Sequence, residues 1–268
     1  MSLSLSDDGL FASHVQGKDL VVYSNVASEN KEVQMENSKE ASVKLLKFSP
    51  GKNQKLASSN RRLLSSNNSR ISIWQLDQLH LFAEIENLEL GTLNIEFGAD
   101  ENEILVFHAW NTKMTIHSLN TGRSSMIKSP KSAYHLGFGY RPQTKHFAIL
   151  LKPEASDLLT IHEPHSYETI NKVTLPTNDA QGLKWSPDGR WIAVWDAASS
   201  GTKVLIFTAD GQLFRTYNGP AEVDDSFDLG IKYIEWSPVG KDGISHTLAI
   251  GKVNGNIDLL RTRTVCIS

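Results

Sequence analysis

The sequence predicts an all-β fold, a β-propeller of about six four-stranded blades, and three observations support this prediction. Apolar segments of 4–7 residues alternate with turns rich in Gly, Pro and Asn, as is typical of antiparallel β-structure. A motif with an apolar or aromatic residue, then Ser-Pro and glycine, recurs along the chain. It recurs at intervals of 41–51 residues, which is typical of propeller blades and not of helical repeats of about 33–34 residues.

The clearest internal match is between Leu183–Trp195 and Ile234–Gly240. A third copy begins at Leu46–Gly51. We take one residue as the marker of each copy: Leu5 in the first and, in the others, Phe48, Phe97, Phe138, Trp185 and Trp236. The steps between markers are 43, 49, 41, 47 and 51 residues. We therefore predict a single propeller domain over 1–268, with repeats near 1–40, 41–90, 91–130, 131–176, 177–225 and 226–268.

Within one repeat, a strand leads into a Ser-Pro-Asp-Gly turn, where proline presets φ and glycine supplies a positive φ. In the fifth repeat we expect strands at 191–195 and 203–207, then an outer strand at 213–217. Residues 29–42 are polar enough to suggest a helix, but Val33 and Met35 lie two positions apart. We predict an outer strand and a loop there.

Composition argues against a nucleic-acid-binding, membrane-spanning or secreted protein. The formal net charge is −3, whereas nucleic-acid-binding domains usually carry a basic excess. No run of 18 apolar residues suggests a membrane span, and the first residues do not resemble a secretory signal. The one cysteine, Cys266, excludes an intrachain disulfide. We expect a protein of a reducing compartment, the cytosol or nucleus.

The repeats resemble degenerate WD repeats. WD repeats usually carry Gly-His and Trp-Asp pairs that form a side-chain hydrogen-bond network, but this sequence has no Gly-His. Trp74-Gln75 and Ile161-His162 are among the pairs that occupy the Trp-Asp position, and Trp195-Asp196 falls at the end of a second strand. We expect the blades to depend on apolar packing without that network. The unequal ends of the chain predict an incomplete ring.

Three segments go beyond the general WD pattern: Gly182–Asp196, Lys203–Tyr217 and Leu229–Pro238. They resemble the family of WD-repeat-containing protein eight, the WRAP-type proteins of centrosomes and spindle poles, most specifically between Gln181 and Leu260. Members of that family are longer, so the resemblance implies that later blades are missing here.

The same resemblance implies a non-catalytic scaffold at the microtubule-organising centre, in the cytoplasm and cytoskeleton. Such a scaffold joins a coiled-coil anchoring protein and a minus-end-directed kinesin, and so anchors microtubule minus ends during spindle assembly. It implies no catalytic residue and no cofactor, and the sequence contains no P-loop, dinucleotide-binding or serine-hydrolase motif.

Candidate polar sites are few. His162 and His165 flank a Glu-Pro pair, but a metal-binding His-Glu-x-x-His motif has another spacing and lies on a helix, so we favour an exposed turn. The acidic stretch 222–228 lacks the pattern of a calcium loop, and we expect a solvated loop there.

The segment 39–70 holds eight basic residues and one acidic residue. It is either an ordinary solvated loop, which we favour, or a basic patch for an acidic partner. The members of this patch are Lys44, Lys47, Lys52, Lys55, Arg61 and Arg62. An RNA- or ribosome-associated propeller of the translation-factor type is the alternative function. A propeller that accompanies a hydrolase domain is a weaker third hypothesis.

Overall fold

The computed structural model describes residues 3–6, 11–16, 19–26, 29–35, 44–49, 62–67, 70–76, 80–86, 91–219, 230–238 and 246–262. The described residues confirm the predicted all-β class: strands dominate, and the two helical segments are single 3₁₀ turns at Ala109–Asn111 and Ala198–Ser200. The chain divides into two compact units, Met1–Ile127 and Lys128–Ser268. The single-domain assignment stays a prediction.

The first unit contains three antiparallel sheets of four strands each. The first sheet is β1 (Leu3–Leu5), β2 (Phe11–Gln16), β3 (Asp19–Val26) and β4 (Glu29–Met35). The second is β5 (Leu45–Phe48), β6 (Arg62–Ser66), β7 (Arg70–Gln75) and β8 (His80–Glu86). The third is β9 (Thr92–Phe97), β10 (Glu103–His108), β11 (Lys113–Ser118) and β12 (Ser124–Lys128). Strand β4 confirms the outer strand predicted at the start of 29–42.

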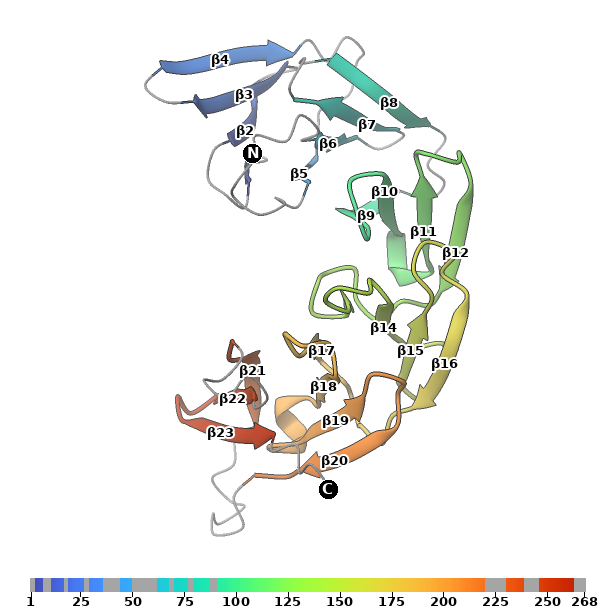
Figure 1. The fold of residues 1–268 in the computed structure, drawn as a ribbon, viewed down its shortest axis with the longest axis vertical. Coiled ribbons are helices and arrows are strands. Elements are labelled where there is room, and N and C mark those ends of the chain that lie inside the picture. The colour runs from blue at the N-terminus through green and yellow to red at the C-terminus, as the bar shows by residue number, and fades with distance from the viewer. Residues whose placement is uncertain are drawn as a thin grey trace. The chain divides into compact units, whose positions relative to one another are not determined.

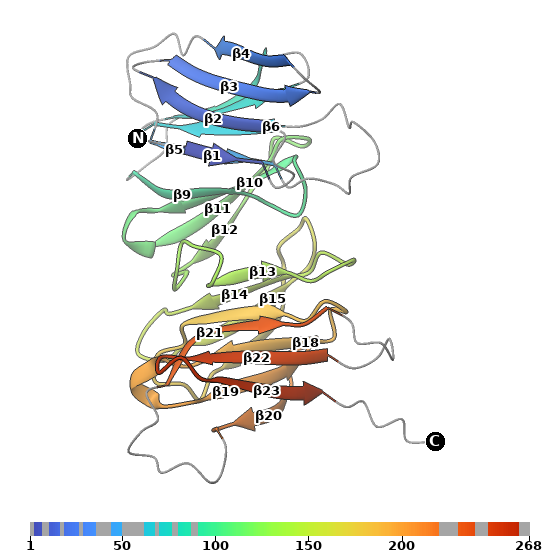
Figure 2. The same ribbon diagram turned by 90° about the vertical axis from the view of Figure 1, so that its left-hand side faces the viewer.

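The second unit has the same organisation (Figure 1). One sheet is β13 (Phe138–Tyr140), β14 (Phe147–Leu151), β15 (Leu158–His162) and β16 (Thr169–Thr174). The next is β17 (Gly182–Trp185), β18 (Trp191–Trp195), β19 (Val204–Thr208) and β20 (Leu213–Tyr217). The last, in the described residues, has three strands, β21 (Ile231–Trp236), β22 (His246–Lys252) and β23 (Ile257–Thr262), which lie side by side (Figure 2).

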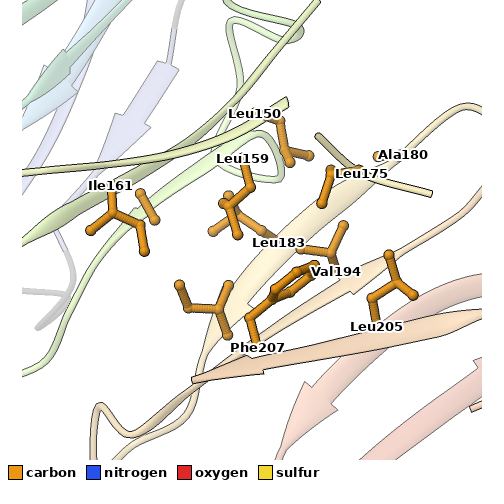
Figure 3. Close-up of a cluster of buried hydrophobic side chains, with 11 residues drawn as sticks. Leu150, Leu159, Ile161, Leu175, Ala180, Leu183, Val194, Leu205 and Phe207 are labelled. Carbon is orange, nitrogen blue, oxygen red and sulfur yellow. The ribbon is translucent and has the colours of Figure 1, made fainter. Parts of the chain in front are cut away.

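Apolar side chains between consecutive sheets form the core. In the second unit, one cluster joins β14 and β15 to β17–β19 (Figure 3), and it contains Leu159, Ile161, Leu183, Val194 and Phe207. A second cluster joins β18 and β19 to β21–β23. Within each unit, consecutive sheets are therefore buried against one another, which is the packing expected of propeller blades.

A serine closes the hairpin between the first two strands of several sheets. Ser186 follows the marker Trp185, its Oγ accepts a hydrogen bond from the Trp191 amide at 3.0 Å, and Gly189 adopts the positive φ of 68°. The Oγ atoms of Ser6, Ser49 and Ser237 accept the equivalent bonds from the amides of Phe11, Arg62 and Thr247. The sequence interpretation assigned this turn to proline and glycine and missed the serine, although the serine recurs after four markers.

The second sheet corrects one expectation about side-chain hydrogen bonds. The Trp74 indole donates to Ser65 Oγ at 2.8 Å, and Arg62 Nε donates to Gln75 Oε1 at 3.2 Å. A buried side-chain network is therefore present in this sheet, with glutamine in place of aspartate. The expectation of apolar packing without a side-chain network was wrong for this sheet. It assumed that replacing the aspartate of the Trp-Asp pair by Gln75 removes the hydrogen-bond acceptor, but Gln75 accepts a bond from Arg62.

Candidate protein-interaction surface

Four of the five marker aromatics lie between sheets. Trp185 Nε1 donates to the Gly139 carbonyl and Trp236 Nε1 donates to the Lys184 carbonyl, each at 3.2 Å. Each indole thus contacts the first strand of the preceding sheet. The other three markers, Phe48, Phe97 and Phe138, end β5 and β9 and begin β13, where they are buried or half-buried. Phe48, Phe97, Trp185 and Trp236 therefore hold neighbouring sheets together.

A histidine of the last sheet contacts the Ser-Pro-Asp-Gly turn of the sheet before it. His246 Nε2 lies 3.0 Å from Asp188 Oδ2, and the imidazole is buried edge-on against Trp236. Partial burial acts to raise the pKa of Asp188, but hydrogen bonds from the Ser186 hydroxyl and the Arg190 amide, together with His246, outweigh it and lower that pKa. The turn is therefore fixed by a contact between sheets.

Connections at one edge of the sheets form a candidate binding surface in the second unit. In an antiparallel sheet the second strand ends, the third begins and the fourth ends at the same edge, so these connections gather there. We call this region the loop surface and define it by residues 129–137, 152–157, 175–181 and 196–203.

Buried aspartates fix the conformation of the loop surface. Asp196, fully buried at the end of β18, accepts hydrogen bonds from the amides of Asn178, Asp179 and Ala197 at 2.8–2.9 Å. Asp157 is equally buried and accepts one from the Ala180 amide at 2.6 Å. Because each carboxylate binds backbone amides of another connection, the loops are held together from within.

Lysines complete this network. Lys131 Nζ donates to Asp157 at 2.6 Å and to Asp179 at 2.7 Å, and Lys152 lies 3.2 Å from Asp179. Lys203 donates to the Pro176 carbonyl and lies 3.9 Å from Asp196. Three lysines face three aspartates, so the network carries little net charge and does not favour a polyanion.

Acid should weaken this network in a predictable way. The hydrogen bond from Lys131 lowers the pKa of Asp179; partial burial opposes this shift and Lys152 reinforces it. A carboxyl with a lowered folded pKa adds stability above its unfolded value, here 3.8, and loses that stability as pH falls through the folded value. We expect Asp179→Asn to make urea-unfolding stability fall less steeply between about pH 5 and pH 3. Lys131→Met should also reduce the dependence of stability on pH in this range. If both variants lost stability with falling pH as steeply as the parent chain, the expectation would be contradicted.

Exposed apolar side chains accompany these ordered loops. Tyr134 and Leu136 project from the connection before β13, and the Leu136 carbonyl accepts the Leu183 amide at 2.7 Å. In the first unit, Trp110 is 92% exposed on the β10–β11 connection, and its φ of 60° is uncommon for a residue other than glycine. Exposed aromatic residues on ordered backbone are common anchors in protein–protein interfaces. The sequence interpretation missed all three, because exposure is not visible in a residue type.

The basic patch is only partly within the described residues. Arg62 is buried, and its guanidinium donates to the Glu101 carbonyl and to Asn102 at 2.8–2.9 Å and lies over the Phe82 ring. Burial lowers the pKa of Arg62, while Glu101 and Asp100 act to raise it. Lys47 pairs with Glu96 at 2.8 Å, and Lys44 lies exposed before β5. Lys52, Lys55, Arg61, the acidic stretch 222–228 and Cys266 lie outside the described residues.

The two histidines that flank Glu-Pro are separated in their environments. His162 is buried, its Nδ1 lies 2.9 Å from the Tyr167 carbonyl and its Nε2 lies 2.9 Å from Thr160 Oγ1, whereas His165 is exposed in a tight turn. Burial lowers the pKa of His162 although the Tyr167 carbonyl acts to raise it. Within the described ranges, no three His, Cys, Asp or Glu side chains gather in a way that could hold a metal ion. The same residues include no helix that is long and apolar enough to cross a membrane.

Known proteins of similar sequence carry WD repeats. The chain is 27% identical over 190 residues to WD repeat-containing protein WRAP73 of Mus musculus, which covers 71% of this chain and 38% of that protein. It is 28% identical over 167 residues to an uncharacterized WD repeat-containing protein of Schizosaccharomyces pombe, which covers 62% of this chain and 33% of that protein. The chain is therefore similar to WRAP-type WD-repeat proteins over most of its length.

A solved structure supports the fold assigned to this chain. The crystal structure of Kluyvelomyces marxianus Hsv2 superposes with a TM-score of 0.57 at 12% identity, over 100% of this chain and 73% of that chain. No protein-family model matches the chain. The chain spans 38% and 33% of the curated relatives' own lengths. WD-repeat proteins typically bind protein partners and are generally non-catalytic.

Proposed function

We propose that this chain is part of a non-catalytic protein-interaction scaffold at the microtubule-organising centre, where it helps to anchor microtubule minus ends. The observation that carries the proposal is the similarity to WRAP73 over 190 residues. The partners, a coiled-coil anchoring protein and a minus-end-directed kinesin, follow from the family resemblance. Its location in the cell, at the spindle pole within the cytoplasmic cytoskeleton, follows from the same resemblance.

The loop surface supports binding of a protein rather than of a nucleic acid. RNA-binding surfaces depend on basic side chains that are available to phosphates. Here Lys131, Lys152 and Lys203 are engaged by aspartates or by a backbone carbonyl, and Arg62 is engaged within the fold. Tyr134 and Leu136 remain exposed beside this balanced network, and an apolar contact within a polar rim is typical of protein–protein interfaces.

The proposal can be tested in dividing cells with the tagged chain, expressed alone and with the later blades of a longer relative fused to it. We expect the fused form to concentrate at spindle poles and to copurify with coiled-coil and motor proteins. Replacing Tyr134 and Leu136 together with serine should remove both signals. Replacing Met126, an exposed residue of β12, with serine is the matched control and should leave both signals unchanged.

Two results would count against the proposal. A fused form that stayed diffuse and recovered neither class of partner would contradict the spindle-pole assignment. Recovery of RNA whose binding falls steeply with added salt would favour the translation-factor alternative, because release of counterions from a polyanion produces that dependence.

A further inference from the structure

We propose that the turn at residues 186–190 is a joint between three consecutive sheets of the second unit, and that it transmits a change in one outer sheet of the three to the other. We call this turn the turn joint. From the β13–β14 connection of the sheet before it, Arg141 Nε donates to the Gly189 carbonyl at 2.7 Å. From the sheet after it, His246 Nε2 lies 3.0 Å from Asp188 Oδ2. Two adjacent residues of one turn thus contact two different sheets.

Hydrogen bonds within the turn joint fix these two contact points relative to each other. The Ser186 hydroxyl donates to Asp188 Oδ1 at 2.6 Å, and the Arg190 amide donates to the same oxygen at 3.1 Å. The Gly189 amide donates to the Ser186 carbonyl at 2.8 Å. Because Oδ1 is bound inside the turn and Oδ2 contacts His246, a shift of the Asp188 carboxylate moves the turn, and the Gly189 carbonyl moves with it.

The contact with Arg141 requires glycine at position 189. Gly189 has a φ of 68°, in the left-handed region that favours glycine. A Cβ at this position would lie 3.0 Å from Arg141 Cγ and 3.2 Å from Arg141 Nε, which is closer than ordinary van der Waals contact. The arginine therefore packs directly on the backbone of the turn, and its guanidinium lies 5.9 Å from the centre of the Trp185 ring. The position of the arginine thus follows the position of the turn.

The first unit contains the same contact in another pair of sheets. Arg62, at the start of β6, donates to the Glu101 carbonyl at 2.8 Å. Glu101 lies four residues after the marker Phe97, as Gly189 lies four residues after the marker Trp185. In each unit, therefore, an arginine of one sheet binds the equivalent carbonyl in the first hairpin turn of the next sheet. Its recurrence in both units indicates that this contact is a regular feature of the fold.

His246 extends the turn joint to a third sheet. Its imidazole is 1% exposed and packs edge-on against Trp236, so it is held within the last sheet. Side chains that share one hydrogen-bond network contribute non-additively to stability, and contiguous contacts of this kind carry coupling between distant positions. Arg141 and His246 are therefore coupled through the turn joint, although they belong to sheets on either side of β17–β20.

Amide hydrogen exchange on the purified full chain, followed by mass spectrometry, tests this coupling. Arg141→Met removes the guanidinium and keeps the apolar stem. We expect it to accelerate exchange in β21 and β22 about tenfold, because the loosened turn no longer holds His246. By reciprocity, His246→Leu should accelerate exchange in β13 and β14. Lys145→Met, at an exposed lysine of the β13–β14 connection, is the matched control and should leave exchange in the last sheet unchanged.

The double variant, Arg141→Met with His246→Leu, measures the coupling itself. If the two contacts acted independently, the accelerations that the single variants produce in β21 and β22 would multiply. We expect the double variant to fall short of that product by at least about threefold, because the second replacement meets a turn that is already loose. Arg141→Lys keeps the charge, loses the Nε donor and should reproduce the pattern of Arg141→Met in milder form.

Each of three results would overturn the proposal. The first is exchange in the last sheet that stays at the parental rate in both Arg141→Met and Arg141→Lys. The second is a double variant whose acceleration equals the product of the single accelerations. The third is equal acceleration in all sheets of the second unit, which would show general destabilisation and no specific path through the turn.

Discussion

Replacing Trp236 with alanine should lower the free energy of unfolding by about 3–5 kcal/mol, the range for large aromatic side chains removed from a core. The Trp236 ring is 6% exposed, it packs in the cluster between β18–β19 and the last sheet, and its indole donates to the Lys184 carbonyl. The variant therefore leaves a cavity and loses one hydrogen bond between sheets. Urea unfolding followed by intrinsic fluorescence measures the loss.

The matched control for this replacement is Trp110→Ala. Trp110 is 92% exposed, so its removal should change stability by less than about 0.5 kcal/mol. The two variants also distinguish a role in packing from a role in partner binding, because Trp236 is buried and Trp110 is exposed. Equal melting temperatures for the parent chain and Trp236→Ala would mean that the repeat alignment is wrong at its last marker.

Asp196→Ala should destabilise the second unit by about 2–5 kcal/mol, because three backbone amides lose their common acceptor. Asp196 is fully buried, so water cannot easily replace the carboxylate at its site. Asp196→Asn keeps one acceptor oxygen and should lose less stability than the alanine variant.

A second readout distinguishes this local role from general unfolding. Amide hydrogen exchange at Asn178 and Asp179 should accelerate in Asp196→Ala more than exchange in β14 and β15, because the loop opens before the sheet does. Uniform acceleration across the second unit would show that Asp196 supports the sheets and not only the loop surface.

The strand order was predictable because it follows from local patterns. Alternating apolar residues and the turn at 186–189 fix where strands begin and end, and the repeat interval indicates how many sheets they form. Even β4 was predictable, since Val33 and Met35 lie two apart. Each of these inferences needs only neighbours in the sequence.

The polar contacts were not predictable because their partners are distant in the sequence. Arg62 was grouped with other basic residues, but its guanidinium extends from β6 of the second sheet to Asn102, in the turn between β9 and β10 of the third sheet. Asp196 was noted only as part of a misplaced Trp-Asp pair, yet it binds amides 17 and 18 residues away. A single sequence does not show which distant polar residues will meet, because many side chains of the same type could be the partner in the folded chain.

The strand order within each sheet has a consequence for how the chain acquires its structure. Within each described sheet, the strands are consecutive in the sequence and each is hydrogen-bonded to the strand before or after it. Loop closure within a sheet therefore spans only a short segment and costs little chain entropy. Each sheet can form as it leaves the ribosome, before the next one is synthesised. Within a unit, it gains further stability when the next sheet of that unit packs against it. The order of synthesis is thus also an order of assembly, from the blue strands to the red strands of Figure 1.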